Sequence, residues 1–273
     1  LTLAAVPAVA QSDGRITLDH IYNTDFFSTQ PVPPTRWTPD GQAYFYYERR
    51  PGAKGPDIVR IHPETGEVTV LVKSEELVPA GDSLPLRPQS YRFSDDNRKL
   101  LLFTNTQRVW RLNTRGDYWV LDLDRHTLKQ LGGRAAKPGT LMFAKFSPQG
   151  DRVAYVREHN LYVERLSDGR ITPLTRDGST TTINGTFDWV YEEEFADRDG
   201  FRWSPDGTRI AYWQLDASGI RDFLLINDTD SLYSFVKPVQ YPKAGTTNSA
   251  VRVGVVSAAG GPTRWLQVPG DPR

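Results

Sequence analysis

Short apolar strands follow polar turns at a nearly constant interval along this chain. Four segments each begin with an aromatic residue, pass through a polar turn and lead into an apolar strand: residues 37–41, 93–97, 146–150 and 203–207. Their third positions, 39, 95, 148 and 205, are 56, 53 and 57 residues apart. Pro sets φ for a turn and Gly supplies positive φ, so each segment is predicted to reverse the chain between two strands.

A second pair of strands is expected after each of these turns. The apolar runs that form these pairs are 57–61 with 68–71, 118–121 with 128–131, 161–163 with 171–174, and 251–256 with 263–268. Four short strands per repeat are typical of β-propeller blades, whereas a stack of β-sandwiches would not require a turn at near-constant spacing. The sequence therefore predicts an all-β fold with about four propeller blades.

The fourth repeat is interrupted by an insertion near residues 221–247. Four blades are the lower limit for a ring, and no strand returns before Arg273 to close one. An open propeller edge would invite pairing with other chains. We therefore expect an incomplete ring that is part of a longer protein. An α/β-hydrolase domain is expected to be absent, because neither a βαβ alternation nor a G-x-S-x-G pentapeptide occurs.

Composition excludes several classes of function. The 33 basic residues balance the 33 acidic ones, so no nucleic-acid footprint is expected. The chain has no cysteine, which excludes disulfides, thiolate metal sites and a Cys nucleophile, and its four histidines lack close metal-ligand spacing. We expect no metal and no cofactor. No apolar run is long enough for a membrane span.

The first ten residues, LTLAAVPAVA, are apolar and end in the small-x-small triplet Ala8-Val9-Ala10. This pattern predicts the remnant of a signal peptide, cleaved after Ala10, and with the absence of cysteine it favours a bacterial periplasmic or secreted protein. The alternative is an ordinary apolar first strand.

Residues 188–195, DWVYEEEF, place three consecutive carboxylates between aromatic side chains. Adjacent Glu side chains repel one another, and aromatic neighbours lower the local dielectric and strengthen that repulsion. A primary ammonium has three donors and can bridge two carboxylates, so the segment is a candidate receptor for a free amino terminus. The alternative is a solvated acidic turn.

Three blocks together resemble the propeller domain of the dipeptidyl peptidase IV family, within the prolyl oligopeptidase clan of serine peptidases. They are DWVYEEEF at 188–195, GFRWSPDG at 200–207 and YPKAG at 241–245, and the resemblance covers most of residues 16–273. It implies an eight-bladed propeller that caps an α/β-hydrolase domain. It also implies that Glu193 and Glu194 bind the substrate's amino group. Glu192 is expected to point away, because three adjacent carboxylates cannot all converge on one ammonium. Arg111, in the segment WRLN at 110–113, would hold the carbonyl of the substrate's second residue.

The resemblance implies an exported exopeptidase that removes Xaa-Pro or Xaa-Ala dipeptides from peptides with a free amino terminus. This chain alone is expected to be inactive, because it lacks the nucleophile motif. Two alternatives remain: a prolyl tripeptidyl peptidase of the same clan, and a propeller that binds peptides or proteins without catalysis. The resemblance further implies a homodimer through the 221–247 insertion and the missing hydrolase domain. Alternatively, the apolar side chains of the insertion pack on the blade beneath.

Overall fold

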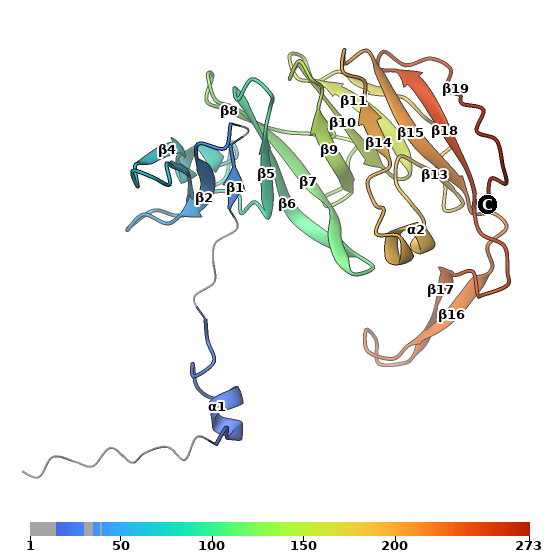
Figure 1. Cartoon of the computed structure of the whole chain (residues 1–273), viewed down its shortest axis with the longest axis horizontal. Helices are drawn as coiled ribbons and strands as arrows, with labels where there is room; N and C mark the ends of the chain where they lie inside the picture. Colours follow the sequence, from blue (N-terminus) through green and yellow to red (C-terminus); the bar gives the residue numbers. More distant parts are fainter. Residues whose placement is uncertain (1–14, 30–34, 39) are drawn as a thin grey trace, which may run out of the picture. The chain divides into compact units, whose positions relative to one another are not determined.

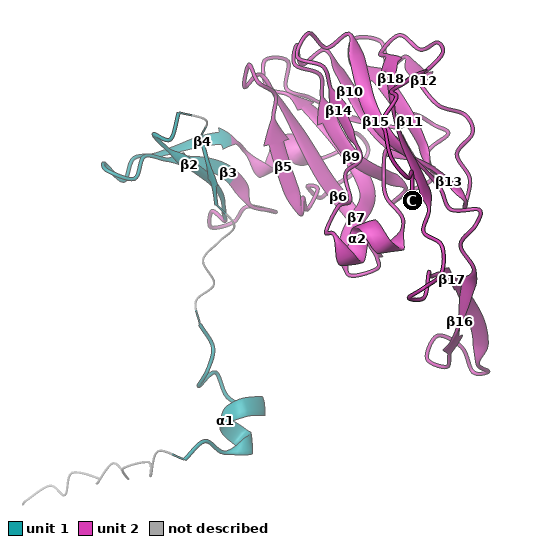
Figure 2. Ribbon diagram, turned by 45° about the vertical axis from the view of Figure 1, so that its right-hand side comes forward, with its two compact units in different colours: residues 1–48, 58–71 teal, residues 49–57, 72–273 magenta. Residues whose placement is uncertain are grey.

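The structure is a computed structural model that describes residues 15–29, 35–38 and 40–273. It divides into two compact units, one of residues 1–48 and 58–71 and the other of residues 49–57 and 72–273 (Figure 2). The predicted signal-peptide remnant, residues 1–10, lies outside the described residues.

The first unit contains one short helix and most of a small sheet. Helix α1 (Leu18–Tyr22) is capped by Thr17, whose hydroxyl accepts a hydrogen bond from the His20 backbone N–H at 3.2 Å. The four-stranded sheet has the order β1-β2-β3-β4. Its strands are β1 (Arg36–Trp37), β2 (Tyr44–Glu48), β3 (Asp57–Ile61) and β4 (Val68–Val72).

In the second unit, a 3₁₀ turn, η1 (Ser74–Leu77), precedes two four-stranded meanders. The first meander consists of β5 (Ser90–Phe93), β6 (Lys99–Val109), β7 (Leu112–Asp122) and β8 (Thr127–Gln130). The second consists of β9 (Leu141–Phe146), β10 (Arg152–Arg157), β11 (Asn160–Arg165) and β12 (Ile171–Pro173). The strands of both meanders pair antiparallel with their neighbours (Figure 1).

A third sheet carries the acidic segment and the insertion. It contains β13 (Thr182–Asn184), β14 (Phe201–Trp203), β15 (Arg209–Asp216), β18 (Ala250–Ser257) and β19 (Arg264–Trp265). Helix α2 (Trp189–Glu194) lies in the chain between β13 and β14. The insertion forms a separate hairpin of β16 (Asp222–Asn227) and β17 (Phe235–Gln240). Strand β19 is shorter than the predicted 263–268 segment.

The repeated turn is closed by a hydroxyl group at its second position. Ser94, Ser147 and Ser204 each accept a hydrogen bond from the backbone N–H five residues later, at 3.0, 3.2 and 3.0 Å. Thr38 makes the equivalent bond with Ala43 at 3.1 Å. Because a hydroxyl both donates and accepts, one side chain satisfies the turn at the start of every repeat. The regular spacing of the sequence therefore reflects one local structure used four times.

Alternating side chains of β10 build the core on both faces of the second meander. Val153 and Tyr155 pack with Leu101 and Val120 of the first meander. Ala154 and Val156 point to the other face and join the cluster that includes Ile210 and Phe201 of the third sheet. This period of two is what a strand buried between two sheets requires. The meanders therefore stack face to face as propeller blades do.

The described residues are 6% helix and 41% strand, and their sheets do not close into a ring. The prediction of an all-β fold is confirmed. The described strands that pair do so antiparallel wherever the register is defined, and they contain no βαβ unit of the hydrolase type.

The first two meanders are joined into one eight-stranded sheet, which the sequence pattern did not predict. Strands β6 and β7 have 11 residues each, and β7 continues far enough to pair with β9 at Arg115↔Met142 and Gly116↔Leu141. On its other side, β7 packs closely against β6 at Gly116. A Cβ atom there would lie 2.5 Å from Phe103 Cε2 and 2.6 Å from the Thr104 carbonyl oxygen.

We expect Gly116→Ala to destabilise the protein by about 1–3 kcal/mol, because the neighbouring backbone cannot move aside freely. The thermal unfolding midpoint should fall by roughly several degrees. Gly219→Ala is the matched control, since its added Cβ would meet only Thr247 Cγ2 at an ordinary 3.5 Å. An equal midpoint for the two variants would contradict this view of the β6–β7 contact.

Candidate functional site

The three glutamates lie on α2, a six-residue helix held at its beginning by Asp188. One carboxylate oxygen of Asp188 accepts a hydrogen bond from the Tyr191 N–H at 3.1 Å. The other accepts one from the Ser249 hydroxyl at 2.6 Å. An Asp at the N-cap satisfies an otherwise unpaired helical N–H and stabilises the end of the helix where its dipole is positive. Asp188 therefore fixes both the start of the helix and its attachment to the segment before β18.

Aromatic contacts hold the body of this helix. The Trp189 ring lies 4.4 Å from that of Tyr241, next to the insertion hairpin. The Tyr191 ring stacks on Phe187 at 5.3 Å and meets the edge of Phe195 at 5.4 Å. Such pairs each add about 0.5–1.5 kcal/mol beyond the area that they bury. The aromatic residues around the acidic triplet therefore anchor a helix that is too short to be stable by itself.

The helix directs the three carboxylates apart, since neighbouring residues are about 100° apart around an α-helix. Glu192 turns inward: its side chain is 5% exposed and its nearest cation is Arg198, with Oε1 and Nε 3.6 Å apart. That distance is too long for a hydrogen bond, and both atoms are buried without a hydrogen-bond partner among the described residues. Burial is the main cause that raises the pKa of Glu192, and the Arg198 charge only partly offsets it.

Glu193 forms an ion pair with Arg111, at the tip of the β6–β7 hairpin. The Glu193 side chain is 4% exposed, whereas that of Arg111 is 78% exposed. Oε2 of Glu193 pairs with Nε of the Arg111 guanidinium. Oε1 is buried with no hydrogen-bond partner in the described part of the chain. One carboxylate oxygen is thus already neutralised and the other is a free acceptor.

Glu194 is exposed at the last turn of α2. The structure thus brings Glu193 and Arg111 into direct contact and places Glu194 next to them along the helix. Glu193, Glu194 and Arg111 together carry one negative charge.

A cavity of about 590 Å³ adjoins the same helix on the side of Glu192. Its wall includes Trp110 and Arg115 of the β6–β7 hairpin, Trp189 and Glu192 of α2, and Val239 of the insertion hairpin. Neither Glu193 nor Glu194 lines it. The two carboxylates of the candidate site are therefore not part of this cavity.

No metal centre is formed by the part of the chain that the structure describes, where no three His, Cys, Asp or Glu side chains are grouped to hold an ion. Within the same residues, no helix has the length and apolar character to cross a membrane.

Two contacts of the site did not follow from the sequence. The bond between Asp188 and Ser249 joins residues 61 positions apart, and nothing local indicates it. The pairing of Glu192 with Arg198 crosses the end of the helix at a separation of six residues, which is not a helical spacing. For Asp188 a signal existed, because Asp before a short aromatic-acidic run is a common N-cap.

Comparison with known proteins shows the family to which this arrangement belongs. Residues 94–273 match the family described as the "Dipeptidyl peptidase IV (DPP IV) N-terminal region". This region is a β-propeller, which confirms the predicted fold class. The chain belongs to the dipeptidyl peptidase IV family.

Relatives and a solved structure agree with the family match. Dipeptidyl aminopeptidase B of Saccharomyces cerevisiae is 31% identical over 208 residues, which cover 74% of this chain and 24% of the yeast protein. A relative from Emericella nidulans is 31% identical over 202 residues, 70% of this chain and 22% of that protein. The crystal structure of Porphyromonas gingivalis dipeptidyl peptidase 4 superposes with a TM-score of 0.82 at 28% identity, over 96% of this chain and 36% of that one. The chain thus spans about a quarter of the length of the curated relatives that it matches.

The prediction of a bacterial periplasmic or secreted protein is wrong. The curated relatives from Saccharomyces cerevisiae, Emericella nidulans and Pyrenophora teres are fungal dipeptidyl aminopeptidases B. The prediction rested on ten apolar residues and on the lack of cysteine. Neither feature distinguishes a bacterial leader from other apolar segments.

The raised pKa of Glu192 predicts how the stability of a Glu192→Gln variant should depend on pH. A folded-state pKa above the ordinary value of 4.5 means that the wild-type side chain contributes fully to stability only below that value, and loses this contribution as pH rises through the folded pKa. Gln resembles the protonated acid, so the thermal midpoints of variant and wild type should be similar near pH 4 (roughly). By about pH 7 the variant should have the higher thermal midpoint. If the thermal midpoint of the wild type instead rose relative to that of the variant over this range, the Arg198 charge would affect the pKa of Glu192 more than burial does.

Proposed function

We propose that this chain is the substrate-positioning propeller portion of a serine exopeptidase that removes dipeptides from the amino termini of peptides. Glu193 and Glu194 bind the free α-ammonium, and Arg111 donates to the carbonyl of the substrate's second residue. The observation that carries this proposal is the buried, unpaired Oε1 of Glu193 beside the Arg111 ion pair.

The electrostatics of the three residues suit such a ligand. Two carboxylates and one guanidinium leave one negative charge, which a single ammonium neutralises. A buried acceptor without a hydrogen bond costs about 1–3 kcal/mol, and an ammonium placed on Oε1 would remove this cost. Arg111 uses Nε for Glu193, so the remaining N–H groups of its guanidinium can donate to a neutral carbonyl.

The role of the site is positioning. An ammonium held at the carboxylates fixes how far the peptide extends, and hence which bond meets the nucleophile. Orientation of this kind can contribute about 7–11 kcal/mol to the lowering of a barrier. The nucleophile itself belongs to the longer protein, because this chain has no G-x-S-x-G motif. The family resemblance of the sequence leads us to expect a preference for Xaa-Pro or Xaa-Ala ends and no need for a cofactor.

Glu193→Gln with Glu194→Gln in the full-length protein should lower kcat/KM for dipeptide release by about a hundredfold or more, since two charge-assisted hydrogen bonds are lost. The measurement is release of a chromogenic group from an Xaa-Pro substrate with a free amino terminus. The matched control is Glu64→Gln with Glu67→Gln, two exposed residues that remove the same charge.

An unchanged kcat/KM in the Glu193 and Glu194 variant would contradict the proposed clamp. The released product separates the alternatives for the wild type: dipeptides support this proposal, whereas tripeptides support a prolyl tripeptidyl peptidase. Peptide binding without any cleavage would support a non-catalytic propeller.

We further propose that the protein is a homodimer through the β16–β17 hairpin. The two strands form their own sheet, and most of their apolar side chains are exposed, with Val239 as a buried exception. Leu232 is 92% exposed, and Leu224 and Tyr233 are also well exposed. A contiguous apolar surface of this kind is costly to leave in water.

Replacing Leu224, Leu232 and Tyr233 by Ser should convert the dimer into a monomer, as measured by light scattering after size-exclusion chromatography. Val68→Ser with Val70→Ser, which changes exposed apolar residues of β4, should leave the mass unchanged. A wild-type monomer, or a triple variant with the mass of a dimer, would contradict the proposed interface.

A further inference from the structure

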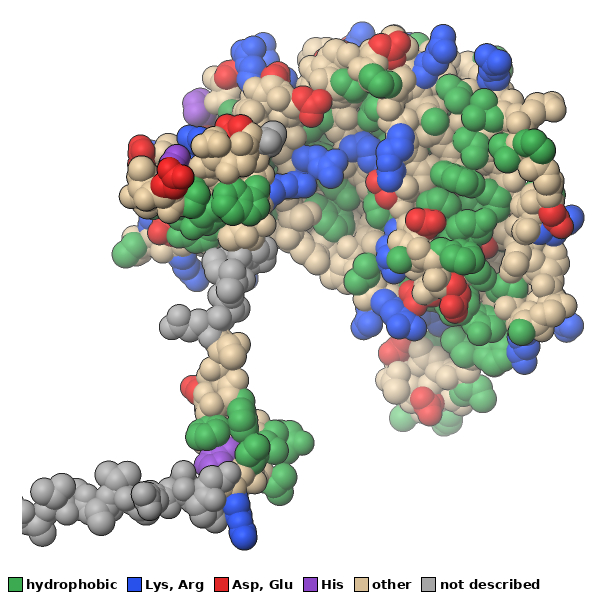
Figure 3. All heavy atoms as spheres, in the orientation of Figure 1, with side chains coloured by type: hydrophobic (Ala, Val, Ile, Leu, Met, Phe, Trp, Pro, Cys, Tyr) green, Lys and Arg blue, Asp and Glu red, His purple; other side chains and the backbone are tan. Residues whose placement is uncertain are grey.

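Each repeat carries a basic residue directly before its aromatic residue. These residues are Arg36, Arg92, Lys145 and Arg202. In the second unit they lie on β5 and β9, the first strands of the two meanders, and on β14 of the third sheet. Lys and Arg side chains form a row over these three strands (Figure 3, compared with Figure 1). We call Arg92, Lys145 and Arg202 the basic row.

Their charges are close enough to affect one another. Lys145 is mostly buried, with 12% of its side chain exposed, and its ammonium lies 3.5 Å from the centre of the Phe201 ring. Burial is the main cause that lowers the pKa of Lys145 to about 8, and the positive charges of Arg202 and Arg92 lower it further.

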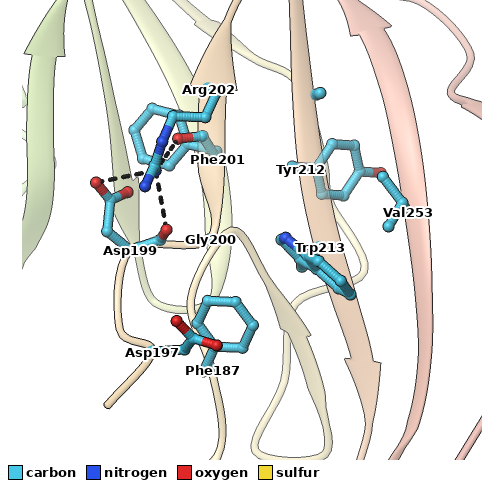
Figure 4. A pocket seen from close by; sticks show the side chains of 10 residues that line it. Phe187, Asp197, Asp199, Gly200, Phe201, Arg202, Tyr212, Trp213 and Val253 are labelled. Atoms are coloured by element: carbon cyan, nitrogen blue, oxygen red, sulfur yellow. Dashed lines mark hydrogen bonds and ion pairs between the residues drawn. The ribbon is translucent and has the colours of Figure 1, made fainter. Parts of the chain in front are cut away.

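Among the described residues, a single carboxylate forms ion pairs with side chains of the basic row. Asp199 forms ion pairs with both Lys145 and Arg202, the latter at 3.1 Å. Arg202 also donates to the Asp199 and Phe201 carbonyl oxygens at 2.9 and 2.6 Å, as the dashed lines in Figure 4 show. Asp197 lines the pocket that Asp199 and Arg202 also line, but it lies beside Phe187, apart from the Arg202 side chain (Figure 4).

The row therefore has two positive charges in excess. No described carboxylate forms an ion pair with Arg92, which is exposed, and 66% of the Arg202 side chain is exposed. Lys145 and Asp199 form a largely buried ion pair, while Arg92 and Arg202 present guanidinium groups to solvent. A guanidinium group binds a carboxylate through two parallel hydrogen bonds, so Arg92 and Arg202 suit acidic side chains of an extended peptide.

The chain connects this row to the proposed amino-terminus site. Glu194 and Asp199 are five residues apart, so at most about 17 Å of backbone separates them. An extended peptide advances about 3.3 Å per residue. A peptide held by its amino group at Glu193 and Glu194 can therefore bring roughly its third to sixth residues within reach of the row.

We propose that the basic row is a second binding site, which takes acidic side chains of the peptide downstream of the anchored amino terminus. This proposal rests on the proposed function for its substrate, but its ligand chemistry, peptide carboxylates on two guanidinium groups, can be tested separately. It predicts that the enzyme favours peptides with Asp or Glu within the first six residues.

The direct test is binding of two fluorescent peptides to the full-length protein. One has the sequence acetyl-Gly-Pro-Gly-Asp-Glu-Asp and the other has Asn and Gln in place of Asp and Glu. Acetylation removes the ammonium, so this measurement does not depend on Glu193 and Glu194. The wild type should bind the acidic peptide more tightly, and more salt should weaken this binding.

Arg92→Gln with Arg202→Gln should weaken binding of the acidic peptide by roughly five- to twentyfold and reduce its salt dependence. Arg92→Gln alone should give a smaller loss of the same kind, and it breaks no ion pair with a described residue. Arg134→Gln with Arg170→Gln, two exposed residues elsewhere, should bind like the wild type. Equal binding of the two peptides by the wild type would overturn the proposal, as would undiminished acidic binding by the double variant.

The corresponding peptides with free amino termini test whether the basic row affects the rate of cleavage. The ratio of kcat/KM for the acidic peptide to that for the neutral one should exceed one in the wild type and fall in the Arg92 and Arg202 variant. Taking the ratio removes any general effect on catalysis. If neither peptide were cleaved while the acetylated acidic peptide still bound through the row, the proposed function would fail and the binding site would stand.

Discussion

The pairing of β7 with β9 is the interaction on which the geometry of the candidate site depends. It joins two meanders into one sheet and extends the β6–β7 hairpin beyond its own blade. Arg111 lies at the tip of that hairpin, so the pairing determines where its guanidinium can reach. At Gly116 the backbone of β7 also lies close to Phe103 and Thr104 of β6, so the hairpin tolerates little additional volume there. A backbone constraint more than sixty residues from the acidic helix therefore positions one half of the Arg111–Glu193 pair.

The position of Glu193, the other residue of this pair, depends on helix α2, which would not be stable by itself. Six residues give too little helical hydrogen bonding for stability in water, and three adjacent carboxylates oppose it further. The Asp188 cap and the rings of Trp189 and Tyr191 supply what is missing. Once the helix is fixed, its geometry separates the carboxylates. One is buried beside Arg198, one pairs with Arg111 and one stays in solvent.

Sequence and structure agree where a local rule repeats. The turn hydroxyl at Ser94, Ser147 and Ser204 makes the same bond each time, so its spacing was sufficient to predict the blades. The joined sheet was not predictable in this way, because residues 104–117 are largely polar and show no buried-strand alternation. The contact of Arg111 with Glu193 spans 82 positions, and only the family resemblance brought these residues together. The predicted bacterial location failed because a short apolar segment carries no information about the organism.

The central claim is that a free ammonium is recognised by the carboxylates of α2. The most direct measurement compares kcat/KM of the full-length wild-type protein for an Xaa-Pro substrate and for the same substrate with an acetylated amino terminus. The clamp predicts that acetylation lowers kcat/KM by about a hundredfold or more, because it removes the charge that Glu193 and Glu194 would bind. Cleavage of the two substrates with similar kcat/KM would contradict the claim.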